Sequence, residues 1–223
     1  HAWTSKMILS VLRKRDSLVI PTVKEAMEQM IQDGITELIV QPTHILDGIE
    51  NNIMKEDVLS YKEEFQSIVF GAPLLSSEKD SQAIIHAISE EFPDLASEDA
   101  LVLMGHGTAH HVNVVYSSLN KAFKSMGYPN FFLGTVEAEP TVQDLVTEVE
   151  DFQPDKIVLT PFMIVAGDHA SNDMAGEDED SWLSQFEASE KFESVDTQIF
   201  GLGEIEGIQK LYIDHTAAVI NEQ

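Results

Sequence analysis

Three segments of the sequence place a histidine or a glutamate shortly after a run of apolar residues. The runs and the residues that follow them are 101–104 with His106, 131–134 with Glu137, and 157–160 with His169. If the runs are parallel strands of one sheet, ligands bind beyond their carboxyl ends, so the three side chains are expected near one another. Two imidazoles and a carboxylate suit a divalent first-row metal ion. Histidine also titrates near neutral pH, so the same residues suit proton abstraction.

Each of these residues also has a simpler interpretation. A histidine at a strand end is often a loop residue bonded to backbone, and most carboxylates are solvated surface groups. His110 and His111 stand at the expected start of a helix, where only one of them could face the site. His86 is interpreted as helical surface and His215 as a surface or interface residue. The coincidence of three candidate side chains at one edge favours the functional interpretation.

Composition and charge narrow the chemistry. The 223 residues include no cysteine, which excludes disulfides, thiolate metal sites and cysteine nucleophiles. The formal charge of −26 opposes binding to nucleic acid and attracts cations. No apolar run has the length of a membrane span. Neither G-x-x-x-x-G-K-[ST] nor G-x-G-x-x-G is present, which counts against a nucleotide-binding enzyme.

Short apolar runs alternate with amphipathic stretches of helical length along the chain. Strands are expected at 37–42, 67–71, 100–104, 131–134, 156–160 and 197–201. Helices are expected at 22–31, 55–64, 81–91, 113–126, 142–152, 182–191 and 204–220. This alternation predicts an α/β fold in which helices flank parallel sheets.

The strand–helix series occurs twice, which predicts two similar Rossmann-like lobes with the active cleft between them. We expect residues 1–97 to form an N-terminal lobe that lacks its first strand and helix and is joined by the C-terminal helix 204–223. Residues 98–203 are expected to form the C-terminal lobe. The opening residues are neither a signal peptide nor an initiator methionine, so we expect the true N-terminus to lie upstream. Cytoplasmic localisation is the default expectation, with export left open.

The same segments carry a resemblance to a known family. They are Met104-Gly105-His106-Gly107-Thr108 with His110-His111, then Gly134-Thr135-Val136-Glu137, then the string VAGDHASNDM at 165–174 with Asp180-Ser181-Trp182, and Gly201-Leu202-Gly203-Glu204. These segments resemble the anaerobic sirohydrochlorin cobalt chelatases, a class II chelatase (CbiK-like) family. The resemblance covers essentially the whole chain, and the string at 165–174 is its most specific part.

The resemblance implies a fold, with two lobes that face a cleft, and an enzymatic activity. The implied enzyme is a lyase of cobalamin biosynthesis that inserts Co²⁺ into a sirohydrochlorin-type tetrapyrrole, with loss of two pyrrole protons. Cobalt is the substrate metal, with Fe²⁺ or Ni²⁺ as alternatives, and no organic cofactor is implied. The implied partners are the tetrapyrrole and the metal, without nucleic acid or membrane, and a homo-oligomer is left open.

The resemblance also implies roles for individual residues. His106 and His169 match the metal-binding and catalytic histidines, and Glu137 matches a glutamate of the metal site. Glu50, in the string HILDGIE at 44–50, matches a second glutamate implicated in activity. Thr108, Lys6 and Ser5 are candidate partners for the substrate's carboxylates. An alternative of another class is a tetrapyrrole or metal carrier that uses the same histidines without turnover.

Overall fold

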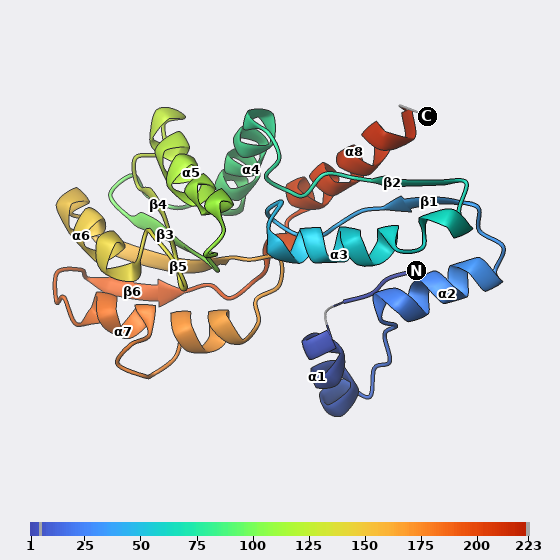
Figure 1. Ribbon diagram of the computed structural model, residues 1–223. Coiled ribbons are helices and arrows are strands. Elements are labelled where there is room, and N and C mark those ends of the chain that lie inside the picture. The colour runs from blue at the N-terminus through green and yellow to red at the C-terminus, as the bar shows by residue number, and fades with distance from the viewer. Residues whose placement is uncertain (5, 222–223) are drawn as a thin grey trace.

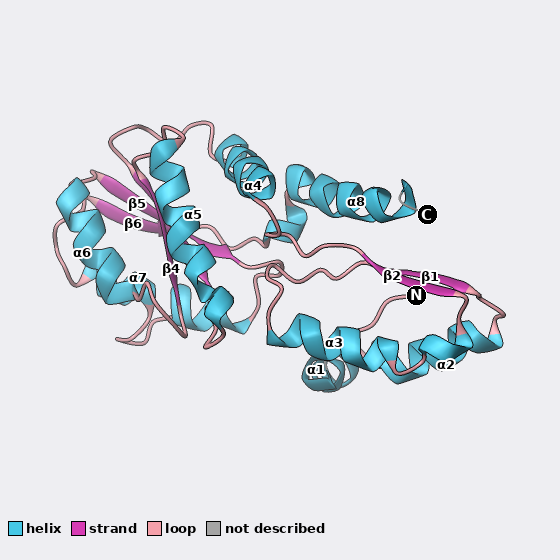
Figure 2. Cartoon of the chain, turned by 45° about the horizontal axis from the view of Figure 1, so that its top comes forward, coloured by secondary structure: helices cyan, strands magenta, loops and turns pink. Residues whose placement is uncertain are grey.

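The chain forms two parallel sheets flanked by helices, as the sequence predicts. The computed structural model describes residues 1–4 and 6–221, without the side chains of Lys6 and Met7. Ser5 and the side chain of Lys6, two candidate carboxylate partners, therefore lie outside the described residues. Figure 2 shows the two sheets at opposite ends of the molecule. In Figure 1 the carboxyl ends of both sheets face the middle of the molecule.

The first sheet contains two parallel strands, β1 and β2. The elements of this half are α1 (Lys6–Asp16), α2 (Val23–Gln32), β1 (Glu37–Val40), α3 (Ile49–Leu59), the 3-10 turn η1 (Lys62–Glu64), β2 (Ser67–Phe70) and α4 (Glu78–Glu91). The start of α2 is fixed by a capping box, in which the Thr22 hydroxyl accepts from the Glu25 amide and the Glu25 carboxylate accepts from the Thr22 amide.

The second sheet contains four parallel strands in the order β4-β3-β5-β6. Its elements are β3 (Ala100–Gly105), the 3-10 turn η2 (His111–Asn113), α5 (Val114–Ser125), β4 (Phe131–Thr135), α6 (Val142–Phe152), β5 (Lys156–Phe162), the π-helix η3 (His169–Met174), α7 (Trp182–Glu187), β6 (Ser194–Thr197), the 3-10 turn η4 (Leu202–Glu204) and α8 (Glu206–Asn221).

Helices cover both faces of the second sheet, so its central strand is buried throughout. All residues of β3 are buried. Leu101 and Leu103 pack with residues of α4, α5 and α8, whereas Val102 and Met104 pack with residues of α6 and α7. This alternation follows from the two-residue repeat of a strand, and burial on both faces explains why the run is continuously apolar.

The C-terminal helix α8 connects the two halves through hydrogen bonds as well as packing. The Tyr212 hydroxyl donates to the carbonyls of Thr43 (3.0 Å) and His44 (3.2 Å) in the loop after β1. The His215 ring donates to the carbonyl of Ala72 (3.0 Å) after β2, and its other nitrogen lies 3.0 Å from the carboxylate of Asp80 in α4. Of the two interpretations of His215, surface residue or interface residue, the first is wrong, since its side chain is 13% exposed and lies between α8, α4 and the loop after β2. Among the described residues, no helix has the length and apolar character needed to cross a membrane.

Lys124 is a partly buried cation at the end of α5. Its Nζ lies 3.3 Å from the centroid of the Phe132 ring and donates to the carbonyls of Pro129 (2.9 Å) and Phe131 (2.8 Å). Burial lowers the pKa of Lys124 to about 8, and the Glu148 carboxylate acts in the opposite direction. The folded chain therefore releases this proton at lower pH than the unfolded chain does.

We expect Lys124→Met to remove a pH-dependent part of the stability. Above pH 8 the unfolded chain binds more protons at this position than the folded chain, so the free energy of unfolding rises with pH up to about 10.5. Lys124→Met should therefore lose stability relative to wild type as the pH is raised through this window. Urea unfolding at pH 7 and pH 10 measures the difference, with Lys121→Met, at an exposed position of the same helix, as the control. A difference that does not change with pH would contradict the assignment.

Candidate metal centre

His106 and Glu137 are brought together by the backbone pairing of β3 with β4. The hydrogen-bond ladder extends past the last residue of each strand. The Val136 amide donates to the Gly105 carbonyl (3.0 Å), and the Glu137 amide donates to the His106 carbonyl (2.9 Å). The two residues therefore lie side by side, and His106 Nδ1 is 3.6 Å from Glu137 Oε2.

His169 reaches the same edge from the other neighbour of β3. Strand β5 pairs with β3 up to Phe162, opposite Gly105. A loop follows, and His169 is the first residue of η3. The rings of His106 and His169 meet edge to face, with their centroids 4.7 Å apart. The parallel sheet thus delivers one side chain after each of three neighbouring strands.

The three side chains form a group of metal-ligand geometry. One potential ligand atom from each of His106, Glu137 and His169 lies within 4.8 Å of the others. The side chains are partly open to solvent, with exposed fractions of 49%, 53% and 36%. Two nitrogen donors and one oxygen donor suit a divalent first-row ion. Three protein ligands on an open edge leave positions for a further ligand or an incoming substrate.

Both imidazoles are oriented by acceptors at Nδ1. His106 Nδ1–H donates to the Gly107 carbonyl (2.9 Å), and His169 Nδ1 contacts the carboxylate of Asp173. In each ring Nε2 then carries the free lone pair and is the atom available to an ion. Sequence reasoning did not assign Asp173, and the signal that could have found it is its spacing of four residues after His169.

Gly107 has a conformation that the site requires. Its φ is +84°, in the region that disfavours side chains. A Cβ at this position would lie 2.9 Å from Thr135 Cβ and 3.0 Å from the Ala138 amide nitrogen. This glycine lets the loop after β3 turn sharply against the loop after β4, where Glu137 lies.

Glu50 lies apart from this group, at the start of α3. It lines a cavity of about 1210 Å³ with His44, Trp3 and Tyr61, and none of the three grouped residues lines that cavity. Burial lowers the pKa of His44 and so favours its neutral imidazole. The charge of Glu50 acts in the opposite direction. The structure therefore places Glu50 at the carboxyl edge of the first sheet and the three grouped residues at the carboxyl edge of the second.

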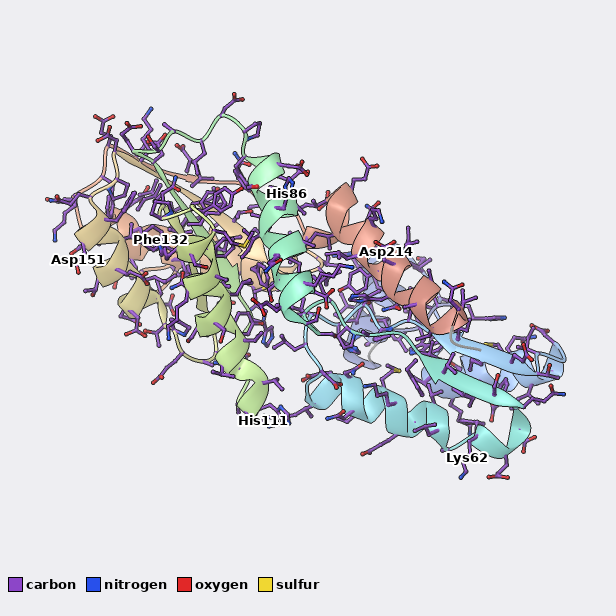
Figure 3. The ribbon with its side chains drawn as sticks, turned by 90° about the horizontal axis from the view of Figure 1, so that it is seen from above. Lys62, His86, His111, Phe132, Asp151 and Asp214 are labelled. Carbon is purple, nitrogen blue, oxygen red and sulfur yellow. The ribbon has the colours of Figure 1, made fainter. Side chains whose placement is uncertain are left out.

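The other candidates shape the loop after β3. The Thr108 amide donates to Asn113 Oδ1 (3.0 Å), and the Thr108 hydroxyl accepts from the His110 amide (3.2 Å). His110 caps η2 through Nδ1, and its ring packs on His111 with centroids 4.1 Å apart. Figure 3 shows His111 at the end of α5 that lies toward α3, and His86 on α4.

Replacing Gly107 tests how far the centre depends on its backbone. We expect Gly107→Ala to lower the free energy of unfolding through a strained φ, about 1–3 kcal/mol, and through crowding against Thr135, about 1–3 kcal/mol more. Gly127→Ala is the matched control, because Gly127 also has a positive φ but no atom within 4 Å of the added Cβ. Urea unfolding of both variants separates the cost of crowding, which only Gly107→Ala has, from the cost of the strained φ, which both have. Co²⁺ titration of both variants shows whether the metal centre is disturbed. Equal losses of stability with unchanged Co²⁺ affinity would contradict the role of Gly107.

Comparison with known proteins identifies the family. The family described as Cobalt chelatase (CbiK) matches residues 1–221. The sirohydrochlorin cobaltochelatase of Salmonella typhimurium is 33% identical over 221 residues, covering 99% of this chain and 83% of the relative. The sirohydrochlorin cobaltochelatase CbiKC of Nitratidesulfovibrio vulgaris is 29% identical over 216 residues, covering 96% and 74%.

A solved structure shares the fold. SirB from Bacillus subtilis with Fe³⁺ superposes with a TM-score of 0.64 at 17% identity, covering all of this chain and 95% of that one. At this identity the likeness supports the fold alone. The family match over nearly the whole sequence is the stronger finding, and the chain belongs to the cobalt chelatase (CbiK) family.

Proposed function

We propose that this chain is a sirohydrochlorin cobaltochelatase, which inserts Co²⁺ into a sirohydrochlorin-type tetrapyrrole and releases two protons. The observation that carries the proposal is the group of His106, Glu137 and His169, whose ligand atoms lie within 4.8 Å of one another. Membership of the cobalt chelatase family and the activity named for the two relatives support it.

The chemistry of insertion needs residues that hold the ion and then release it. In this proposal His106, His169 and Glu137 hold Co²⁺ at the edge of the second sheet, on one side of the ring. Pyrrole nitrogens replace these ligands one after another, and the two pyrrole protons leave to an imidazole or a carboxylate. Proximity of ion and ring, and removal of water from the ion, are the main contributions of the protein.

Glu50 is proposed as a further catalytic residue that acts from the first sheet. The carboxyl ends of both sheets face the middle of the molecule (Figure 1), so a macrocycle bound there would have Glu50 on one side and the metal group on the other. This arrangement motivates the division into an N-terminal lobe, residues 1–97 with 204–223, and a C-terminal lobe, residues 98–203.

Recognition of an anionic substrate needs cations in this acidic chain. Helix α1 ends in three consecutive exposed basic residues, Arg13, Lys14 and Arg15. Asp16, and more weakly Asp168, raise the pKa of Arg15. Asp168 directly precedes His169 in the sequence, so Arg15 interacts with a carboxylate next to the metal group. We propose that Arg13 and Lys14 attract the carboxylates of the tetrapyrrole.

Replacement of the two histidines tests the proposed activity. We expect His106→Ala and His169→Ala each to lower the rate of Co²⁺ insertion on the order of 10²-fold or more while the chain stays folded, because each loses an ion ligand and a proton acceptor. The assay follows the absorption bands of sirohydrochlorin with Co²⁺, Fe²⁺ or Ni²⁺, and His86→Ala, on the exposed side of α4, is the control. Normal rates in both variants would refute the assignment, and stoichiometric binding without turnover would favour a carrier.

Neutralising the end of α1 tests substrate recognition. We expect Arg13→Gln with Lys14→Gln to raise KM for the tetrapyrrole about threefold to tenfold, since each exposed charge contributes a few tenths to about 1 kcal/mol. The Co²⁺ affinity should stay unchanged, and the effect should shrink as salt is added. Lys62→Gln with Lys156→Gln removes the same charge elsewhere, because Lys156 is the exposed first residue of β5, at the amino end of the second sheet. Figure 3 shows Lys62 near the far end of the first sheet. An equal rise of KM in that control would indicate a general charge effect.

A further inference from the structure

His169 is held by a carboxylate from its own helix. Its Nδ1 contacts Asp173 Oδ2, four residues along the chain, and Asp173 is 46% exposed. The carboxylate of Asp173 does not belong to the group of three ligand atoms. Its contact is with Nδ1, so that Nε2 is the ring nitrogen left for the proposed ion, and Asp173 supports the ion through His169.

The π-helix η3 makes this contact a fixed feature of the fold. Ala170 and Met174 are fully buried, and Met174 packs in the apolar cluster beneath the second sheet with Trp182. The Ala175 amide donates to the Ala170 carbonyl (3.2 Å), five residues back. One face of η3 is thus anchored in the core, and the adjacent face carries His169 and Asp173 in contact with each other. Single π-helical turns occur often at functional sites.

The two imidazoles of the metal group are supported by acceptors of different charge. His106 Nδ1 donates to a neutral carbonyl, that of Gly107 (2.9 Å), and lies 3.6 Å from the Glu137 carboxylate, beyond hydrogen-bond distance. His169 Nδ1 contacts the carboxylate of Asp173 directly. A carboxylate at Nδ1 fixes the tautomer, orients the ring and raises the basicity of Nε2 more than a carbonyl does. The two rings therefore differ in their strength as donors to an ion.

We propose that Asp173 is a positioning residue that holds the Nδ1–H tautomer of His169 and makes His169 the stronger of the two imidazole ligands. Under this proposal His169 retains the ion while His106 is the imidazole that a pyrrole nitrogen displaces first. The order of displacement rests on the proposed function. The tautomer and the metal affinity do not, since both are properties of the protein with metal alone.

The test compares Asp173→Asn, Asp173→Ala and Asp173→Glu with wild type. We expect the dissociation constant for Co²⁺, measured without tetrapyrrole, to rise about tenfold to 100-fold in the Asn and Ala variants. Asp173→Glu retains a carboxylate and should recover part of the affinity. Glu177→Gln removes one negative charge from the exposed loop after η3, and its affinity should match wild type. In turnover, KM for Co²⁺ should rise more than kcat falls.

A spectroscopic readout separates positioning from folding. In metal-free wild type, ¹⁵N NMR of the imidazoles should show His169 as the Nδ1–H tautomer, and Asp173→Ala should shift it toward Nε2–H. Wild-type Co²⁺ affinity and an unchanged tautomer in Asp173→Ala, with binding lost in His169→Ala, would overturn the role of Asp173 and leave the proposed function intact. Weakened Co²⁺ binding in Asp173→Asn together with an inactive wild type would support the role of Asp173 and refute the proposed function.

Discussion

The parallel pairing of β3 with its two neighbours is the constraint on which the site depends. Hydrogen bonds between β3 and β4 continue beyond both strands and set His106 beside Glu137, while β5 ends level with Gly105 and leads to His169. Pairing of this kind needs a central strand that is buried on both faces, which α4 and α5 on one side and α6 and α7 on the other provide. The apolar core and the polar edge are therefore two consequences of one sheet.

The negative charge of the chain attracts the metal ion and repels the anionic tetrapyrrole. A net charge of −26 raises the local concentration of divalent cations and repels a macrocycle that carries carboxylates. The proposed attraction of the carboxylates by the basic end of α1 acts only nearby, because at physiological salt an exposed charge acts over only about 8 Å. Long-range attraction of the ion and short-range attraction of the ring can thus coexist on one surface.

Periodicity, caps and strand ends made much of this structure predictable. Helix α6 begins and ends as expected, because Thr141 and Asp144 form a capping box and apolar residues recur at helical spacing. Beyond the residues that follow the strands, contacts between distant residues were not predictable. His215 was interpreted as a surface or interface residue because nothing local indicates its contact with Asp80. Strand β6 covers Ser194–Thr197 and not 197–201, since its pairing with β5 uses backbone groups while Phe200 packs against Phe92 in the core.

The least predictable feature of the site is how its ligands are supported. Sequence position indicates that His106 and His169 follow strands, but the acceptor at each Nδ1 depends on a loop with positive φ at Gly107 and on a π-helical turn around Asp173. A chelatase must bind an ion and also give it up, so ligands of equal and maximal strength would oppose the reaction. A partly exposed group of three ligands, with different acceptors at the Nδ1 atoms of its two imidazoles, can both bind and release the ion. The weaker imidazole can leave while the stronger one keeps the ion in reach of the ring.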